Sequence, residues 1–368
     1  MDSKLYAVID IGSNTNRLVI FKKDGYGRLN EIENVKSVTR LRNYLDEEGN
    51  LSQEGIVTLL KTLRSFKEIV KTYSIHTLIC AATATIRVAK NREKIKKIVN
   101  EQIGWDLEIL TEEEEAFYGY LSVVNSTNIH EGLTIDLGGA STEITYFNDR
   151  KMVYSHSFPF GSLSLKYIFN EMKDINELEL YINNQLSAIP WLRNLQTPLI
   201  GIGGSARNLA QIDQFQKNYP MGGLHQYKMT GPDLERLVSY LSSLSVQQLQ
   251  KLEGLSKDRA DTIVPAAIVF SCVYKYINAS SFIVSKKGLR EGIFYKELYK
   301  DMEFTLAPSV IKNSIQELVI DYGQNEAQIN HVESLTYSLY EQLKNFKLVH
   351  LTEDDWQLLQ LAIPVYYL

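Results

Sequence analysis

The chain has 368 residues, of which 44% are hydrophobic and 23% charged, and its formal net charge at pH 7 is -5. A chain of this length exceeds one compact domain, so we expect two main lobes and a further module. The negative charge argues against a general attraction to nucleic acid or to an anionic membrane, so any polyanion must be held by a local site. The sequence contains no apolar segment of membrane-spanning length, which predicts a soluble, cytoplasmic protein.

The two cysteines, Cys80 and Cys272, both lie in apolar runs. Such positions favour buried free thiols in a reducing compartment. The histidines are scattered without the spacing of metal ligands, so the sequence does not predict a structural zinc site.

The first third of the chain predicts an α/β domain. Strands are expected at residues 5–11, 17–21, 28–38, 77–82 and 106–110, with a hairpin turn at 24–27. Ser52 is a typical N-cap, and Ile56, Leu59 and Leu63 follow it at helical spacing. Further helices are expected at 92–102 and, after the cap Thr111, up to about residue 124.

From residue 132 the order of elements begins again. Strands are expected at 133–137, 143–147, 152–158, 199–202 and 282–284, and helices at 206–212, 234–241 and 259–276. After residue 301 the pattern is wholly helical, with helices expected at 311–320, 332–343 and 354–362. We therefore predict three domains, residues 1–124, 125–300 and 301–368.

An internal repeat connects the two halves. Residues 7–21 and 133–147 share Ile, Asp, Gly and Phe at a constant offset, so that Asp10 corresponds to Asp136. The offset is too long for a solenoid. It indicates a duplicated α/β domain with a cleft between the two copies.

In each copy a buried strand ends in a small polar turn. Such turns expose backbone N–H groups that can surround phosphate oxygens, and glycine allows close approach. A third small-residue turn precedes a helix, whose N-terminus would favour an anion. The phosphate-binding residues predicted from these turns are Ser13, Asn14, Gly138, Gly139, Ala140, Ser141, Thr142, Gly203, Gly204 and Ser205. A single turn of this kind could equally be an ordinary β-turn capped by aspartate.

Several motifs resemble those of the exopolyphosphatase and guanosine pentaphosphate phosphohydrolase (Ppx/GppA) family, and they occur in that family's order. They begin at Asp10 (Asp-Ile-Gly-Ser-Asn-Thr-x-Arg-Leu), Ala82 (Ala-Thr-Ala-Thr-Ile-Arg), Glu114 (Glu-Glu-Ala), Asp136 (Asp-Leu-Gly-Gly-Ala-Ser-Thr-Glu) and Gly288 (Gly-Leu-Arg-Glu-Gly). The resemblance covers residues 5–300 and includes Arg259-Ala-Asp261. It implies two α/β domains of the actin-like (ribonuclease H-like) fold, as in sugar kinases and Hsp70. It also implies phosphoanhydride hydrolysis.

The resemblance gives three residues catalytic roles. Glu115 matches the catalytic base, Arg87 matches an arginine that faces the phosphate, and Glu143 ends the second motif. Each has a plainer explanation: the glutamates at 112–115 could simply stabilise a helix start through its dipole, and Arg87 could be a surface arginine. Water needs a carboxylate to accept its proton during phosphoryl transfer, which suits Glu115.

Carboxylates beside a polyanion require a cation between them. Asp10, Asp136 and Glu143 are therefore the expected metal ligands, with Mg²⁺ as the expected cofactor.

The resemblance predicts release of orthophosphate from polyphosphate, from guanosine pentaphosphate or from both, by a homodimer. The two substrates present the same terminal group, so the sequence does not separate them. An actin-like kinase, with residues 201–205 against adenosine, and a non-catalytic sensor of guanosine tetraphosphate or pentaphosphate remain alternatives. The helical tail resembles the start of a truncated third domain. The basic run at residues 90–97 could steer polyphosphate or could be a solvated helix face.

Overall fold

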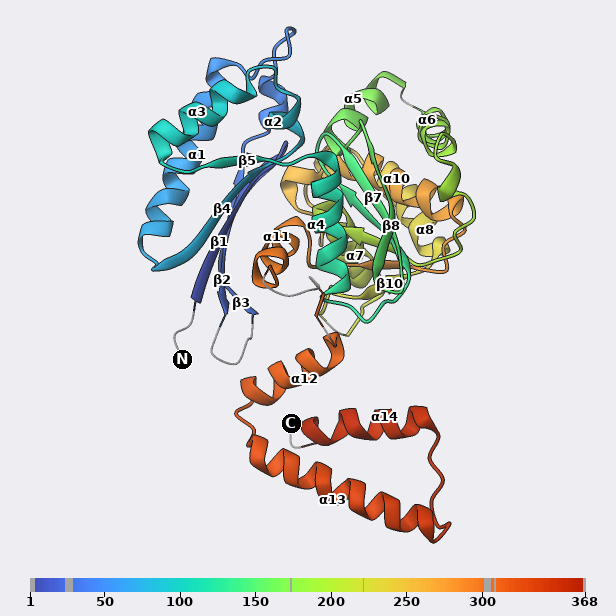
Figure 1. Ribbon diagram of the computed structural model, residues 1–368. Helices are drawn as coiled ribbons and strands as arrows, with labels where there is room; N and C mark the ends of the chain where they lie inside the picture. The colour runs from blue at the N-terminus through green and yellow to red at the C-terminus, as the bar shows by residue number, and fades with distance from the viewer. Residues whose placement is uncertain are drawn as a thin grey trace. The chain divides into compact units, whose positions relative to one another are not determined.

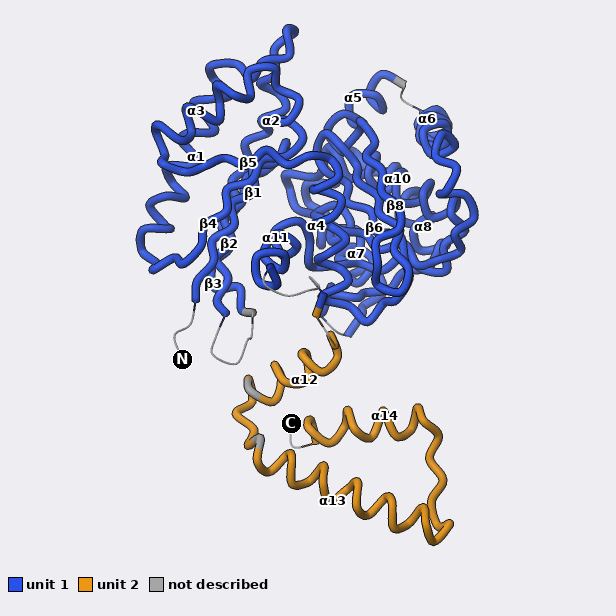
Figure 2. The backbone as a smooth tube through the Cα atoms, viewed as in Figure 1, with its two compact units in different colours: residues 1–306 blue, residues 307–368 orange. Residues whose placement is uncertain are grey.

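The computed structural model describes residues 4–23, 29–172, 174–220, 222–300, 306–307 and 309–366. The hairpin turn predicted at 24–27 lies outside these residues. The chain forms two compact units, residues 1–306 and 307–368 (Figure 2). Within the described residues no helix is long and apolar enough to cross a membrane.

The first sheet of the larger unit has the order β3-β2-β1-β4-β5. Its strands are β1 (Lys4–Ile11), β2 (Thr15–Lys23), β3 (Leu29–Val38), β4 (Ile75–Ala82) and β5 (Leu107–Ile109). The first three strands form an antiparallel meander, and β4 and β5 run parallel to β1. Helices α1 (Gln53–Lys71) and α3 (Arg92–Ile103) cover one face, while α2 (Ala84–Val88) follows β4 (Figure 1).

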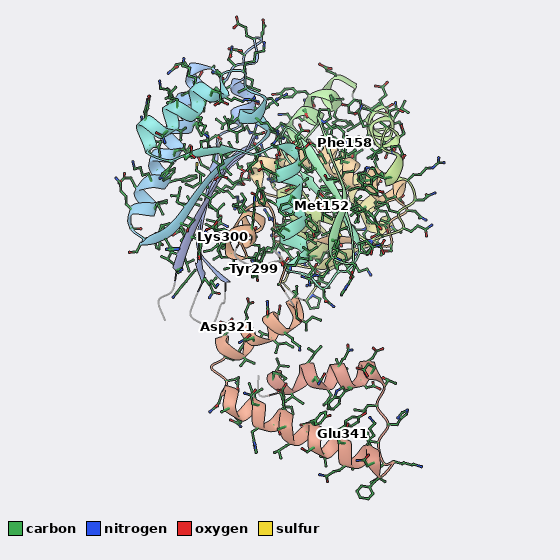
Figure 3. The ribbon with its side chains drawn as sticks, viewed as in Figure 1. Met152, Phe158, Tyr299, Lys300, Asp321 and Glu341 are labelled. Atoms are coloured by element: carbon green, nitrogen blue, oxygen red, sulfur yellow. The ribbon has the colours of Figure 1, made fainter. Side chains whose placement is uncertain are left out.

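The second sheet repeats this order and adds one strand, giving β10-β11-β9-β6-β7-β8. Its strands are β6 (Gly132–Leu137), β7 (Thr142–Asn148), β8 (Lys151–Phe158), β9 (Leu199–Ile202), β10 (Tyr227–Met229) and β11 (Phe282–Val284). Strand β8 forms one edge, and its side chains run from the exposed Met152 to the buried Phe158 (Figure 3). The helices that belong to this half are α5 (Ser162–Met172), α6 (Ile175–Ser187), α7 (Gly203–Gln216), α8 (Gly231–Ser242), α9 (Val246–Leu249) and α10 (Ile263–Tyr276).

Helices α4 (Glu112–Val124) and α11 (Leu289–Leu298) lie between the two sheets (Figure 1). Successive side chains of β1 point to opposite faces of the sheet. Ala7 and Ile9 pack under α1 and α3, whereas Tyr6 and Val8 face α4 and α11. The second sheet contacts α4 and α11 through a smaller cluster that includes Phe147. Its opposite face carries the largest core, beneath α5 to α8 and α10.

The antiparallel meander followed by parallel strands, found twice, confirms the predicted α/β fold with duplicated actin-like domains. The predicted boundaries at 124 and 300 stay a prediction. The short strand β10 and helix α2 were not anticipated from the sequence. Cys80 and Cys272 are both buried and free, as predicted.

The smaller unit consists of α12 (Val310–Asp321), α13 (Glu326–Asn345) and α14 (Glu353–Ala362), which match the helical tail predicted from the sequence. Trp356 of α14 stacks on Tyr340 of α13, with ring centroids 4.5 Å apart. Few of its described apolar side chains are buried; Val319, Ile329 and Ile363 are among them.

Helices α4 and α11 touch through their backbones. A Cβ at Gly292 of α11 would overlap the carbonyl oxygen of Tyr118 in α4. We expect Gly292→Ala to lower the free energy of unfolding by about 1–3 kcal/mol, because overpacking forces two helices apart. Urea denaturation would measure this, with Gly222→Ala as a control because a Cβ there would meet nothing within 4 Å. An unchanged midpoint would show that the helices can separate at no cost.

Candidate active site

The turns after β1 and β6 are built in the same way. The N–H of Gly12 donates to the carbonyl oxygen of Thr15 at 3.2 Å, and the N–H of Gly138 donates to that of Ser141 at 3.0 Å. A Cβ would lie 2.8 Å from the Thr15 oxygen at Gly12 and 3.0 Å from the Ser141 oxygen at Gly138. Both turns are therefore too tight for a side chain at the glycine, and the sequence repeat is also a structural repeat.

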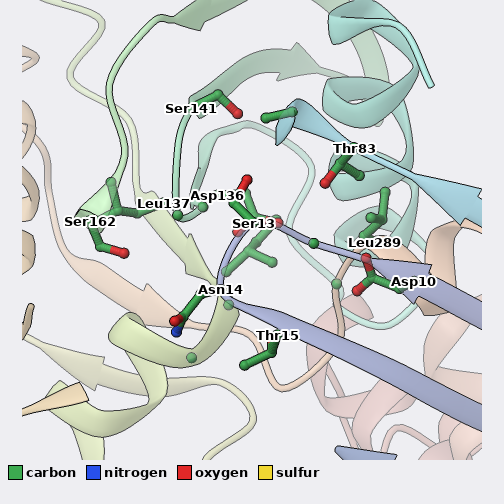
Figure 4. Close-up of a pocket in the computed structure, with 18 of the residues that line it drawn as sticks. Asp10, Ser13, Asn14, Thr15, Thr83, Asp136, Leu137, Ser141, Ser162 and Leu289 are labelled. Carbon is green, nitrogen blue, oxygen red and sulfur yellow. The ribbon is translucent and has the colours of Figure 1, made fainter. Parts of the chain in front are cut away.

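The two turns face each other across a pocket in the larger unit (Figure 4). A Cβ on Gly139 would lie 3.0 Å from Cβ of Ser13 and 3.3 Å from the backbone nitrogen of Asn14, so the two turns touch. Of the predicted phosphate-binding residues, those that line the pocket are Ser13, Asn14, Gly138, Gly139, Ser141, Gly203 and Gly204. The cleft expected between the copies is thus present, and its part in phosphate binding stays a prediction.

Ala140, Thr142 and Ser205 are not among the lining residues. The hydroxyl of Thr142 donates to the carbonyl oxygen of Phe160 at 2.7 Å, and that of Ser205 accepts from Arg259 at 3.1 Å. Both hydroxyls therefore support the pocket's walls from behind.

The third wall is the start of α7. Gly203 begins this helix with φ 86° directly after β9. A Cβ there would lie 2.8 Å from Oδ1 of Asp136, so the strand carboxylate and the helix N-terminus are close neighbours. The N-terminal N–H groups of α7 add partial positive charge to the pocket.

Arginine side chains from four segments also line the pocket. These pocket arginines are Arg17, Arg207, Arg259 and Arg290. Burial, followed by repulsion from Arg290, lowers the pKa of Arg207 to about 10. Burial also lowers the pKa of Arg259. Guanidinium groups held this close to one another favour a multiply charged anion.

None of the pocket arginines was predicted from the sequence as a site residue. Arg17, Arg259 and Arg290 stand inside the quoted motifs, which was the available signal. Arg207, in the first turns of α7, had no such signal.

The acidic start of α4 contains two kinds of glutamate. Glu114 closes a capping box, in which its carboxylate accepts from the Thr111 N–H at 2.9 Å. Glu115 lines the pocket. Burial raises the pKa of Glu115 to about 7, although the neighbouring Arg87 opposes the shift. Helix capping and the candidate base are therefore assigned to adjacent but different residues.

Arg87 is next to Glu115 and not among the residues that line the pocket. Its Nη1 donates to Oε2 of Glu115 at 2.8 Å and to the carbonyl oxygen of Leu110 at 3.0 Å. The sequence placed Arg87 against the phosphate, whereas the structure places it against the candidate base. From there it can orient the carboxylate of Glu115 and limit the rise of its pKa.

The three predicted metal ligands differ in their surroundings. Asp10 lines the pocket and forms an ion pair with Arg290, its Oδ2 lying 2.9 Å from Nη1. Asp136 also lines the pocket, and burial raises its pKa to about 6. Glu143 is buried and is not among the lining residues; it accepts from the Ser157 hydroxyl at 3.1 Å, and its pKa is raised well above its usual value by burial and then by Glu115. Among the described residues, no group of three His, Cys, Asp or Glu side chains could by itself hold a metal ion.

Asp136 and Glu143 are direct partners across β6 and β7. In the first copy the corresponding pair across β1 and β2 is Asp10 and Arg17. Like charges directly opposite each other are destabilising in a sheet. A cation near the two carboxylates would reduce the repulsion between them.

Comparisons with known proteins agree with this fold. A model of the Ppx/GppA phosphatase family matches residues 19–301. Exopolyphosphatase 1 of Mycobacterium tuberculosis (strain H37Rv) is 25% identical over 309 residues, which is 81% of this chain and 89% of the relative.

The solved structures of similar proteins cover the same part of the chain. The crystal structure of the Aquifex aeolicus Ppx/GppA family member aligns with a TM-score of 0.72 and 25% identity, covering 82% of this chain and all (100%) of that one. An exopolyphosphatase structure from Cytophaga hutchinsonii shares the fold, with a TM-score of 0.73, 24% identity, and coverage of 83% of this chain and 100% of that chain. Helices α12 to α14 lie beyond the family match. Because the match spans most of the larger unit, the chain belongs to the Ppx/GppA phosphatase family.

Proposed function

We propose that this protein hydrolyses the terminal phosphoanhydride bond of inorganic polyphosphate and releases orthophosphate. The observation that carries the proposal is the position of Glu115, a largely buried carboxylate with a raised pKa, in a pocket formed by two glycine turns and the pocket arginines. Such a pocket suits an anion with several charges, and Glu115 suits the transfer of one proton at neutral pH. The family membership and the exopolyphosphatase relatives support the same reaction.

In the proposed reaction the end phosphate lies in the pocket, against the turn at Ser13 and Asn14 and the turn at Gly138 and Gly139. The oxygen of a water molecule bonds to the terminal phosphorus while Glu115 accepts a proton from that water. The bridging P–O bond breaks, and the shortened chain leaves as a phosphate anion. The pocket arginines neutralise the charge on the phosphate oxygens as the bond breaks.

Two of the three predicted metal ligands are suited to hold a divalent cation together with the substrate. Mg²⁺ in phosphate enzymes is usually held by one or two carboxylates together with substrate phosphates and water. Asp136 and Glu143 supply two such carboxylates, whereas Asp10 is already paired with Arg290. When bound, the cation would supply positive charge to the phosphate oxygens and relieve the repulsion between Asp136 and Glu143.

The lining favours polyphosphate over a nucleotide. The apolar residues that line the pocket are Ala84, Leu137, Ile202 and Leu289, and none of the described lining residues is aromatic. A purine base is usually held by stacking or by a larger apolar surface, so recognition through phosphate groups alone is the better match. Guanosine pentaphosphate remains the second candidate because its triphosphate end offers the same group.

The test is phosphate release from polyphosphate, guanosine pentaphosphate and ATP, each with Mg²⁺ and with EDTA. We expect the fastest release from polyphosphate, with no acceptor present, and loss of release in EDTA that Mg²⁺ restores. Transfer of phosphate that requires an acceptor would indicate the kinase. Tight guanosine nucleotide binding without turnover would indicate the sensor.

The homodimer stays a prediction, which sedimentation equilibrium would check.

A further inference from the structure

A carboxylate outside the pocket is linked to all of its walls. Asp261 is not among the lining residues, and its side chain is 19% exposed. Its Oδ2 lies 2.7 Å from Nζ of Lys166 and 3.2 Å from Nη1 of Arg40. Arg40 belongs to the first half of the unit and Lys166 to the second. Asp261 therefore bridges the two halves of the duplicated fold.

The Arg40 contact leads to the first phosphate turn. The backbone N–H of Arg40 donates to the carbonyl oxygen of Asn14 at 2.9 Å, and that of Arg42 donates to Ser13 at 3.2 Å. Arg40 has left-handed backbone angles, φ 48° and ψ 47°. This conformation is unfavourable for a residue with a Cβ, so the surrounding contacts must hold it. The ion pair with Asp261 is one of those contacts.

The Lys166 contact leads to the second phosphate turn. Lys166 lies in α5, whose first residues are hydrogen-bonded to that turn. The N–H of Ser162 donates to the carbonyl oxygen of Gly138 at 2.8 Å, and the N–H of Leu163 donates to that of Gly139 at 2.9 Å. A shift of α5 would thus move the glycine turn with it.

The third link is through the chain itself. Asp261 follows Arg259 by two residues, and Arg259 lines the pocket. A Cβ at Gly204 would overlap the Arg259 guanidinium, so this arginine rests directly on the start of α7. Arg40 also donates from Nη2 to the carbonyl oxygen of Asp258 at 3.2 Å, which strengthens the attachment of this segment to the first half.

We propose that Asp261 is a positioning residue that holds the three phosphate-binding walls at the spacing required by the terminal phosphate. Its carboxylate holds Arg40 behind the first turn and Lys166 behind the second, and the chain connects it to Arg259 over the third. The proposal rests on the proposed function for its catalytic consequence. The alignment of the walls can be measured without turnover.

The central test uses Asp261→Asn, which keeps the shape of the side chain and removes its charge. We expect faster amide hydrogen exchange in residues 12–14 and 138–141, and tripolyphosphate binding weakened on the order of tenfold by calorimetry. Glu235→Gln is the matched control, because it breaks an exposed ion pair, 3.0 Å from Lys275, away from the pocket. Unchanged exchange and unchanged tripolyphosphate affinity in a folded Asp261→Asn protein would overturn the proposal.

A second set of variants separates positioning from simple loss of stability. Arg40→Gly removes the side chain while tolerating the left-handed backbone, and Arg40→Lys keeps the charge. We expect Arg40→Gly to reproduce the Asp261→Asn effect, the double variant to add little to either, and Arg40→Lys to recover most of the affinity. Additive losses in the double variant would show that the two residues act independently. If the wild-type chain binds tripolyphosphate but releases no phosphate, the proposed function fails while these tests of Asp261 still stand.

Discussion

Glu115→Gln is expected to lower kcat for phosphate release by about 10²–10⁴-fold, the usual contribution of a general base. The amide keeps the shape of the side chain and its contact with Arg87, but it cannot accept a proton from water. Glu113→Gln is the matched control, since Glu113 is in the same helical turn and is exposed. A Glu115→Gln variant that retained wild-type kcat would show that another group takes the proton.

The pH dependence of the wild type gives an independent check on the same residue. Burial raises the pKa of Glu115 to about 7, and the base acts only when ionised. The value of kcat/KM should therefore rise with pH up to about 7 and then level off. Glu115 binds its proton more tightly in the folded protein than in the unfolded chain. Its ionisation therefore lowers the stability as the pH rises from the ordinary pKa of a glutamate to about 7. For this reason Glu115→Gln should not lower the Tm at pH 8, and a lost activity would not reflect unfolding.

Arg290→Met is expected to lower the free energy of unfolding by about 3–5 kcal/mol, because it leaves the carboxylate of Asp10 buried without its partner. The two groups lie 2.9 Å apart, and the exposed fractions of their side chains are 13% and 14%. Burial already raises the pKa of Asp10 despite Arg290. Without the arginine this pKa should rise further, so the loss of stability should be greatest at neutral pH and smaller in acid, where Asp10 is protonated.

Guanidinium denaturation at two pH values would measure this effect. The double variant Asp10→Asn/Arg290→Met should recover much of the lost stability, because no charge is then left unpaired. It should not recover phosphate release, since a pocket arginine is still missing. Equal losses of stability at both pH values would indicate that packing, and not charge, explains the role of Arg290.

The sequence predicted the fold through features that are local or repeated. The strands around Asp10 and Asp136 were recognisable because each is a buried run that ends in a small polar turn, and the offset between them indicated a duplication. Helix α4 was recognisable from the cap at Thr111. The short strand β10 reads Tyr-Lys-Met and has no apolar run in or beside it, unlike the equally short β11, which reads Phe-Ile-Val.

The arrangement of the site depends on contacts that no local pattern specifies. Asp10 and Arg290 are far apart in the sequence, so their ion pair became visible only in the folded chain. Only the resemblance to the family, and no local pattern, predicted that Glu115 has a different role from the glutamates beside it in the same acidic run. Arg87 was assigned by resemblance to the phosphate, whereas its closest carboxylate is Glu115.

The cross-strand pairs at the ends of the two central hairpins imply different sources of charge balance in the two halves. In the first half, Arg17 stands opposite Asp10 and Arg290 forms an ion pair with it, so the positive charge is part of the polypeptide. In the second half, Glu143 stands opposite Asp136, and on the proposed function a cation from solution would add to the charge of the pocket arginines. The charge balance of the second half would then depend on the ions of the medium more than that of the first half does. The ionic composition of the cell would then act on this protein through a single hairpin.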